Sequence, residues 1–164
     1  MGQRREQIRR TLTEFCDAFN RNDLDGVMAF FTDDGLYKTF EGRERRGSEA
    51  IRAEFAPQFK GRYGKMLFDV EDLLIDEEQG RAVLRWTCFH EPAWSGAQSV
   101  LRLLFGKRFG WQGLDVFYLE GEKIAQKHTF TRAPLPAVSR KAEREVVPLS
   151  GGDVGPRARL AEGR

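Results

Sequence analysis

The segment from Trp111 to Phe130 constrains the fold more than any other part of the chain, because it has the pattern of two strands joined by a tight turn. Apolar and aromatic residues fill Val116–Leu119 on one side of Gly121-Glu122, and apolar residues recur on the other side. A glycine at the first central position suits a two-residue hairpin loop of type II′. The segment therefore predicts an antiparallel hairpin with one buried face.

A two-residue loop fixes which residues of this hairpin face each other. It pairs Leu119 with Ile124 and Asp115 with His128, and it places both members of each pair on the buried face. Burying a carboxylate beside an imidazole costs free energy, so such a pair is usually kept for chemistry or ligand orientation. A slip of one residue would instead turn His128 outward and bring Lys127 and Thr129 inward.

Composition and charge limit the classes of protein to be considered. The 164 residues amount to one domain with a proper core, and the 13 phenylalanines favour a packed interior with an apolar cavity. The formal charge of +2 comes from the tail after residue 132, so the body is neutral, which argues against nucleic-acid binding. The chain has no apolar run of about 18 residues, so we expect no membrane span. Its charged N-terminal segment does not resemble a secretion signal.

The two cysteines, Cys16 and Cys88, lie far apart and without the spacing of metal ligands. We interpret them as reduced core residues of a cytoplasmic protein and expect neither a metal nor a cofactor.

The first third of the chain is expected to be mainly helical. The apolar residues Ile8, Leu12, Phe15 and Phe19 recur at helical spacing and predict an amphipathic helix over about 3–20. Asn22 or Asp23 can cap a second helix, whose apolar stripe runs to Phe31 before residues 32–35 break it. A short strand over 36–40 and a charged loop over 42–47 follow. Ser48 caps a third helix, which Pro57 ends.

Strands are expected from residue 66 onward. Alternation begins at Met66 and changes phase near Asp72, as at a bulge, and residues 76–80 form the next turn. The strand over 81–91 places Leu84, Trp86, Cys88 and His90 on one face. Residues 92–110 stay open, since 99–105 fit either a strand or a short lid helix. The proline- and glycine-containing stretch 137–164 is predicted to be a flexible tail, which leaves 1–136 as the folded domain.

Helices followed by a long sheet indicate the α+β class. Four stretches resemble the SnoaL-like polyketide cyclase and ketosteroid isomerase group of the nuclear transport factor 2-like superfamily; they start at Phe19, Phe31, Arg46 and Asp115 and read FNRNDLDG, FTDDGLY, RGSEAI and DVFYLEGEKI. The resemblance covers about residues 5–132. It implies a cone-shaped curved sheet of four to six strands, three helices on its concave face, and a homodimer formed through the outer sheet face. Because this fold serves isomerases, cyclases, hydrolases, dehydratases and plain binders, the resemblance says more about fold than about chemistry.

The resemblance places Asp115 at the position of an acid/base aspartate, and its apolar surroundings favour a raised pKa. It also places Phe15 where the isomerases have a catalytic tyrosine, and Thr39 or a neighbour where they have an aspartate base. Phenylalanine donates no hydrogen bond and threonine is no carboxylate base, so ketosteroid isomerase activity itself is not expected.

The functional hypothesis is cofactor-free acid/base chemistry (cyclisation, isomerisation or dehydration) on a small apolar carbonyl or polycyclic molecule. Asp115 would be the acid/base, His128 its partner and His90 a polarising group, although each also fits a purely structural role. The predicted cavity walls are Phe15, Phe19, Tyr37, Trp86, Trp111 and Phe117, of which Tyr37 equally fits a core or interface position. The alternative is a non-catalytic dimeric domain that binds a hydrophobic ligand or a protein.

Overall fold

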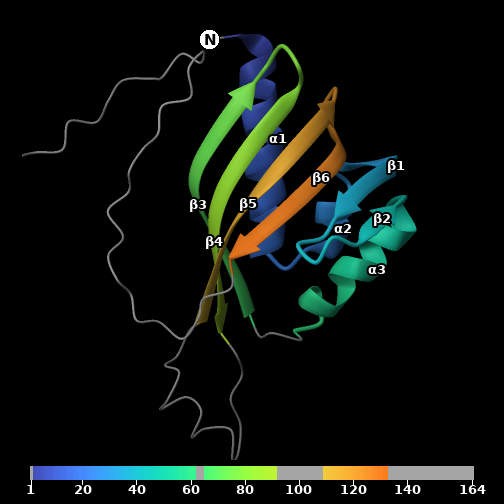
Figure 1. Cartoon of the computed structure of the whole chain (residues 1–164), viewed down its shortest axis with the longest axis vertical. Helices are drawn as coiled ribbons and strands as arrows, with labels where there is room; N and C mark the ends of the chain where they lie inside the picture. Colours follow the sequence, from blue (N-terminus) through green and yellow to red (C-terminus); the bar gives the residue numbers. More distant parts are fainter. Residues whose placement is uncertain (1, 62–64, 92–108, 133–164) are drawn as a thin grey trace, which may run out of the picture.

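The computed structural model describes residues 2–61, 65–91 and 109–132 (Figure 1). Three helices and six strands make up this part of the chain. In order they are α1 (Gln3–Asn20), α2 (Leu24–Met28), β1 (Phe31–Lys38), β2 (Glu44–Arg46), α3 (Ser48–Phe59), β3 (Lys65–Asp76), β4 (Arg81–Glu91), β5 (Phe109–Glu120) and β6 (Lys123–Arg132).

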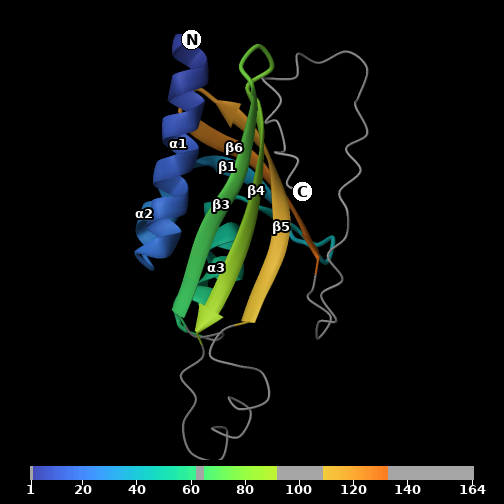
Figure 2. The ribbon, with the colours of Figure 1, turned by 90° about the vertical axis from the view of Figure 1, so that its left-hand side faces the viewer.

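The strands form one sheet in the order β2-β1-β6-β5-β4-β3. The pair β1 and β6 is parallel, and all other neighbours are antiparallel. The long strands curve, and the helices lie on one side of the sheet, with α1 running along it (Figure 2). The expected α+β fold with a mixed, curved sheet is confirmed.

The core lies between the helices and the concave face of the sheet. The apolar stripe of α1 predicted from its spacing is buried, with Ile8 and Leu12 fully inaccessible. Aromatic rings fill the space beneath it, and Phe15 makes edge contacts with Phe19 and Phe117 at centroid distances of 5.1 and 5.7 Å. Such contacts stabilise a core beyond their buried area.

Local signals place several boundaries correctly. Asp23 caps α2, where its side chain accepts a hydrogen bond from Gly26 N at 2.8 Å. The pairing of β3 with β4 shifts register between Val70 and Asp72, which confirms the bulge predicted there. The hairpin turn falls at Gly121-Glu122, and Gly121 has φ +62°, a value that favours glycine.

Four local predictions were wrong. Gly47, and not Ser48, is the N-cap of α3, and the Ser48 hydroxyl donates to Asp33 O at 3.4 Å. Phe31 begins β1 instead of ending α2. The polar residues that follow it belong to the strand at an irregularity, where the five residue steps from Phe31 to Leu36 lie opposite only two steps on β6, from Ile124 to Gln126. The charged loop contains the short strand β2, which pairs with the end of β1. The third helix continues through Pro57 to Phe59, because a proline so near the C-terminal end removes little of the hydrogen-bond ladder.

Some predictions fall outside the described residues. They are the lid or strand expected over 99–105 and the flexible tail 137–164; the latter also sets the boundary of the predicted domain. β5 itself begins at Phe109, earlier than the start of the predicted hairpin.

Candidate active site

The carboxyl group of Asp115 is the centre of a buried polar cluster on the concave face. Asp115 is 3% exposed, and its neighbours Lys127 and Thr129 are 5% and 7% exposed. Lys127 Nζ donates to Asp115 Oδ1 at 2.8 Å and to Thr129 Oγ1 at 2.6 Å, and the Thr129 hydroxyl donates to the same Oδ1 at 2.6 Å. On the other side, Trp86 Nε1 donates to Oδ2 at 2.9 Å. The carboxylate is thus held from both sides by donors.

The predicted pairing of Asp115 with His128 was wrong, and a bulge is the reason. The ladder between β5 and β6 is regular at Leu119–Ile124 but shifts by one residue, so that Tyr118 pairs with Gln126 and Asp115 with Thr129. Ala125 is the extra residue of β6. Beyond it every side chain changes face, as in the alternative register.

His128 therefore lies on the outer face, away from Asp115. Its ring is 5.2 Å from the Tyr118 ring, and its Nε2 lies 3.2 Å from Gln126 Oε1. Partial burial and the nearby Lys38 lower the pKa of His128 below its ordinary value. This arrangement gives His128 no contact with the cavity.

Lys127 carries its charge inside the protein. Burial alone would lower its pKa, but the charge of Asp115, the neighbouring Tyr37 and the hydrogen bond to Asp115 outweigh burial and raise it. The ammonium also lies 4.9 Å from the centroid of the Tyr37 ring, a distance at which a cation is attracted by the ring face. Lys127 is consequently a protonated hydrogen-bond donor at neutral pH, and not an amine nucleophile.

The thiol of Cys16 lies within the electrostatic reach of this pair. Burial and the charge of Asp115 raise the pKa of Cys16 to about 12, and burial raises that of Cys88 to about 12 as well. Both cysteines are buried and form no disulfide. Thiols with such pKa values stay protonated and are poor nucleophiles.

A cavity of about 400 Å³ opens beside the cluster, a size typical of small-molecule sites. Its inner part is walled by aromatic side chains with Lys127 and Thr129 among them, and its mouth by charged side chains. The lining residues are Phe19, Tyr37, Thr39, Phe40, Glu41, Arg43, Ala53, Glu54, Phe55, Pro57, Gln58, Met66, Phe68, Trp86, Cys88, Trp111, Lys127, Thr129 and Thr131. Asp115 lies behind Lys127 and Thr129 and is not itself part of the lining.

The sequence-predicted site residues are only partly brought together. Phe19, Tyr37, Trp86 and Trp111 line the cavity, whereas Phe15 and Phe117 belong to the core beneath it. The backbone of His90 pairs with Met66 and Phe109, but its side chain is outside the described part of the structure.

Two donor groups of the inner cavity, the Lys127 ammonium and the Tyr37 hydroxyl, are not fully used in hydrogen bonds within the described part of the protein. An ammonium group has three N–H donors, and Lys127 uses two of them within the protein. The hydroxyl of Tyr37 forms no hydrogen bond with any described residue, while its ring packs 4.8 Å from the Phe55 ring. A ligand in the inner cavity would meet these two donors, and Asp115 would offer it no free acceptor.

Sequence reasoning gave Lys127 and Thr129 only as an alternative and missed the charged mouth. The available signal was the alternation of polar Lys127, Thr129 and Thr131 along β6. No three His, Cys, Asp or Glu side chains among the described residues come together as metal ligands. In the same part of the chain, no helix is long and apolar enough to cross a membrane.

The curved sheet with its helix-covered cavity defines an α+β protein of the nuclear transport factor 2-like, or cystatin-like, class. The family model described as SnoaL-like domain matches residues 12–127, and the chain belongs to this family. No curated protein sequence matches the chain at a significant level.

Solved structures share this fold at low sequence identity. A putative polyketide cyclase from Xanthomonas campestris pv. campestris is 17% identical with a TM-score of 0.61; the match covers 78% of this chain and 92% of that one. SalBIII, an epoxide hydrolase/cyclase-like enzyme of pyran ring formation in the polyether salinomycin, is 16% identical with a TM-score of 0.63, covering 77% and 92%. PrhC from Penicillium brasilianum is 16% identical with a TM-score of 0.64, covering 79% and 83%.

Proposed function

We propose that this protein is a cyclase-type enzyme that acts without a cofactor on a small, largely apolar carbonyl compound. The observation that carries the proposal is the buried ammonium of Lys127, fixed by Asp115 and Thr129 at the inner end of an aromatic cavity. Membership of the SnoaL-like family, and structural neighbours described as cyclases, support the type of reaction.

The chemistry follows from where charge develops. When a carbonyl compound enolises or is attacked by a carbon nucleophile, negative charge accumulates on the carbonyl oxygen. The unused N–H of Lys127 and the Tyr37 hydroxyl are placed to donate to that oxygen, and solvent water that enters the cavity takes the α-proton. Donors fixed in advance in such a site stabilise the transition state, and one donor is typically worth about 10²–10³ in rate.

Asp115 acts through Lys127 in this proposal and does not touch the substrate. Its carboxylate keeps the buried amine protonated and orients the ammonium, so it is a positioning residue. Because the amine is held as an ammonium, covalent Schiff-base chemistry is disfavoured.

The rate of α-proton exchange is a direct test, because it measures enolisation without requiring the natural substrate. We expect the protein to accelerate deuterium incorporation into an aromatic β-diketone in D₂O, followed by NMR. Lys127→Met should reduce this acceleration about 10²–10³-fold, and Tyr37→Phe should reduce it less. Both variants should still bind the diketone, as measured by quenching of the fluorescence of Trp86 and Trp111, which line the cavity.

A non-catalytic binding protein is the second candidate, and one observation favours it. Both oxygens of Asp115 accept hydrogen bonds from protein donors, and the carboxyl group is shielded from the cavity. The inner end thus lacks a free carboxylate base among the described residues. Diketone binding without accelerated exchange would support this function and contradict the enzymatic one.

A further inference from the structure

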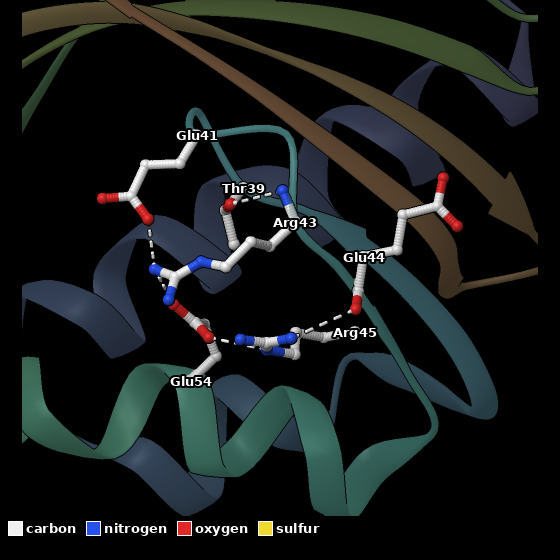
Figure 3. A network of polar contacts seen from close by, with 6 residues as sticks. All are labelled: Thr39, Glu41, Arg43, Glu44, Arg45 and Glu54. Carbon is white, nitrogen blue, oxygen red and sulfur yellow. Dashed lines mark hydrogen bonds and ion pairs between the residues drawn. The ribbon is translucent and has the colours of Figure 1, made fainter.

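The mouth of the cavity is built from charged side chains that the inner site does not use. Arg43 and Glu41 come from the connection between β1 and β2, and Glu54 comes from α3 (Figure 3). All three line the cavity. Their ion pairs join the connection to the helix across the opening.

The backbone at Arg43 is fixed. Arg43 N donates to Thr39 Oγ1 at 3.1 Å, and Arg43 O accepts from Thr39 N at 2.9 Å. Glu54 is held in turn, since its Oε2 accepts from Arg45 Nε at 2.7 Å. The mouth therefore has a defined geometry.

The guanidinium of Arg43 uses one nitrogen in this network. Its Nη2 lies 3.2 Å from Glu54 Oε1 and also contacts Glu41 (Figure 3). Its Nε and Nη1 have no protein partner among the described residues, and the side chain is 51% exposed. Arginine presents its N–H donors in a planar fork that matches a carboxylate.

Glu41 occupies part of the position that a carboxylate ligand would take. Its side chain is 48% exposed and forms an ion pair with Arg43 only among the described residues, whereas that of Glu54 is 19% exposed and is shared by two arginines. Glu41 can therefore turn into solvent at small cost, because exposed ion pairs contribute little to stability. Both donor edges of a guanidinium include Nη2, so Arg43 would then present one complete edge, Nη2 with Nε or with Nη1, to a ligand carboxylate.

We infer that the ligand of this cavity carries a carboxylate at the end opposite its carbonyl group, and that Arg43 binds this carboxylate at the mouth. The inference rests on the proposed function for the inner end. It defines the substrate class as an aromatic or polycyclic keto acid: the carbonyl reaches Lys127 and Tyr37, the apolar body lies against the aromatic walls, and the carboxylate stays at the opening.

A matched pair of probes separates the two ends of the ligand. Acetylnaphthalene has the ketone alone, and acetylnaphthoic acid adds the carboxylate on the distal ring. We expect the wild-type protein to bind the acid about tenfold more tightly, the effect of about 1.4 kcal/mol from an added charge-assisted hydrogen bond. Affinities are measured by isothermal titration calorimetry at low ionic strength, with folding of each variant checked by circular dichroism.

Three single substitutions test the role of Arg43. Arg43→Gln should abolish the difference between the two probes, and Glu41→Gln should enlarge it because the competing carboxylate is gone. Lys38→Gln is the matched control: it removes a positive charge from the ion pair with Glu44 at 2.8 Å, and neither residue is among the lining residues. This control should leave the difference within about twofold.

The outcomes for the two proposals are distinguishable. If the acid binds no better than the ketone, or if the difference survives Arg43→Gln, the carboxylate inference is wrong, whatever happens at the inner end. If Lys127→Met leaves the exchange rate of the diketone unchanged, the proposed function is wrong, and the difference between the probes still reports on Arg43.

Discussion

A lysine and an aspartate buried together are the residues on which the site depends. Removing two charges from water costs several kcal/mol for each ion, so their mutual attraction does little more than offset that cost. Trp86 and Thr129 donate additional hydrogen bonds, so that both oxygens of the Asp115 carboxylate have a donor. The pair is thus tolerated as a unit, and neither member is stable in the interior alone.

Breaking this pair on one side should be more harmful than removing it entirely. We expect Asp115→Asn to lower the free energy of unfolding by about 3–5 kcal/mol, because it leaves the Lys127 ammonium without its counter-charge. The double variant Asp115→Asn with Lys127→Met should lose less than the single variant. Urea unfolding at neutral pH measures both, and equal losses in the two variants would contradict a charge-pair origin.

The same pair should make stability depend on alkaline pH. Asp115 raises the pKa of Lys127 in the folded protein above the unfolded value of about 10.4. Below the unfolded value both states bind the proton, and the contribution to stability is fully present; it is lost as the pH rises through the folded pKa. The difference in unfolding free energy between wild type and the double variant Asp115→Asn with Lys127→Met should therefore be constant from pH ~7 to ~10 and decrease above that range. An increase in this difference as the pH rises towards ~10 would show that burial, and not Asp115, determines this pKa, because the unfolded state would then bind more protons than the folded state.

At the scale of the element, β5 positions the site through a glycine. Trp86 on β4 pairs with Gly113, and a Cβ added at Gly113 would lie 2.6 Å from the Trp86 ring and 2.6 Å from Phe130 O. The missing side chain lets the indole lie against β5 with its Nε1 directed to Asp115, two residues further along.

Substituting this glycine should disturb both strands. We expect Gly113→Ala to lower the free energy of unfolding by about 1–3 kcal/mol, as overpacking does, and to shift the tryptophan emission. Gly110→Ala in the same strand is the control, because its Cβ would lie 3.3 Å from the Phe89 ring, which needs to move only slightly. Equal losses at the two positions would indicate a general cost of alanine in β5 and not the displacement of Trp86.

The elements themselves could be predicted because their signals are local. The spacing from Ile8 to Phe19 defined α1, Asp23 capped α2, and a change of phase marked the bulge in β3. The second bulge, at Ala125, could not be recognised from the sequence of β6, because Gln126 and His128 are polar and fit either face of the strand. Register was therefore uncertain by one residue, and one residue decides which side chains enter the cavity.

The candidate site, like the register of the hairpin, was predicted only in part. Asp115 was placed correctly on the buried face, but its expected apolar surroundings were wrong because Lys127 and Thr129 replace His128 beside it. The charged mouth combines a β1–β2 connection with a helix residue, and such a contact between Arg43 and Glu54 has no signature in sequence spacing. Tertiary contacts of this kind require the fold.

At the scale of the whole molecule, the sheet has two faces with different roles. The concave face carries the helices and the cavity, and the opposite face is open in the described structure (Figure 2). Apolar side chains continue across this outer face from strand to strand: Leu74 pairs with Val83, which pairs with Val116, and Leu114 pairs with Phe130. Leu74, Leu114 and Phe130 are 62%, 37% and 56% exposed.

We propose that a second copy of the chain covers this outer face, as the family resemblance implies. A two-fold axis brings the same apolar patch of each subunit together, which suits a surface that has no other apolar partner in the described structure. Light scattering coupled to size-exclusion chromatography should give the mass of a dimer, and Phe130→Glu should give that of a monomer. The substitution should change the stability of the subunit itself by less than about 0.5 kcal/mol, because the side chain is on the surface.

Phe40→Glu is the matched control, since Phe40 is 54% exposed but lies in the connection between β1 and β2. A monomeric wild type, or equal effects of both substitutions, would contradict dimerisation through this face, whereas a monomeric Phe130→Glu that still binds the diketone would show that the cavity functions within one subunit.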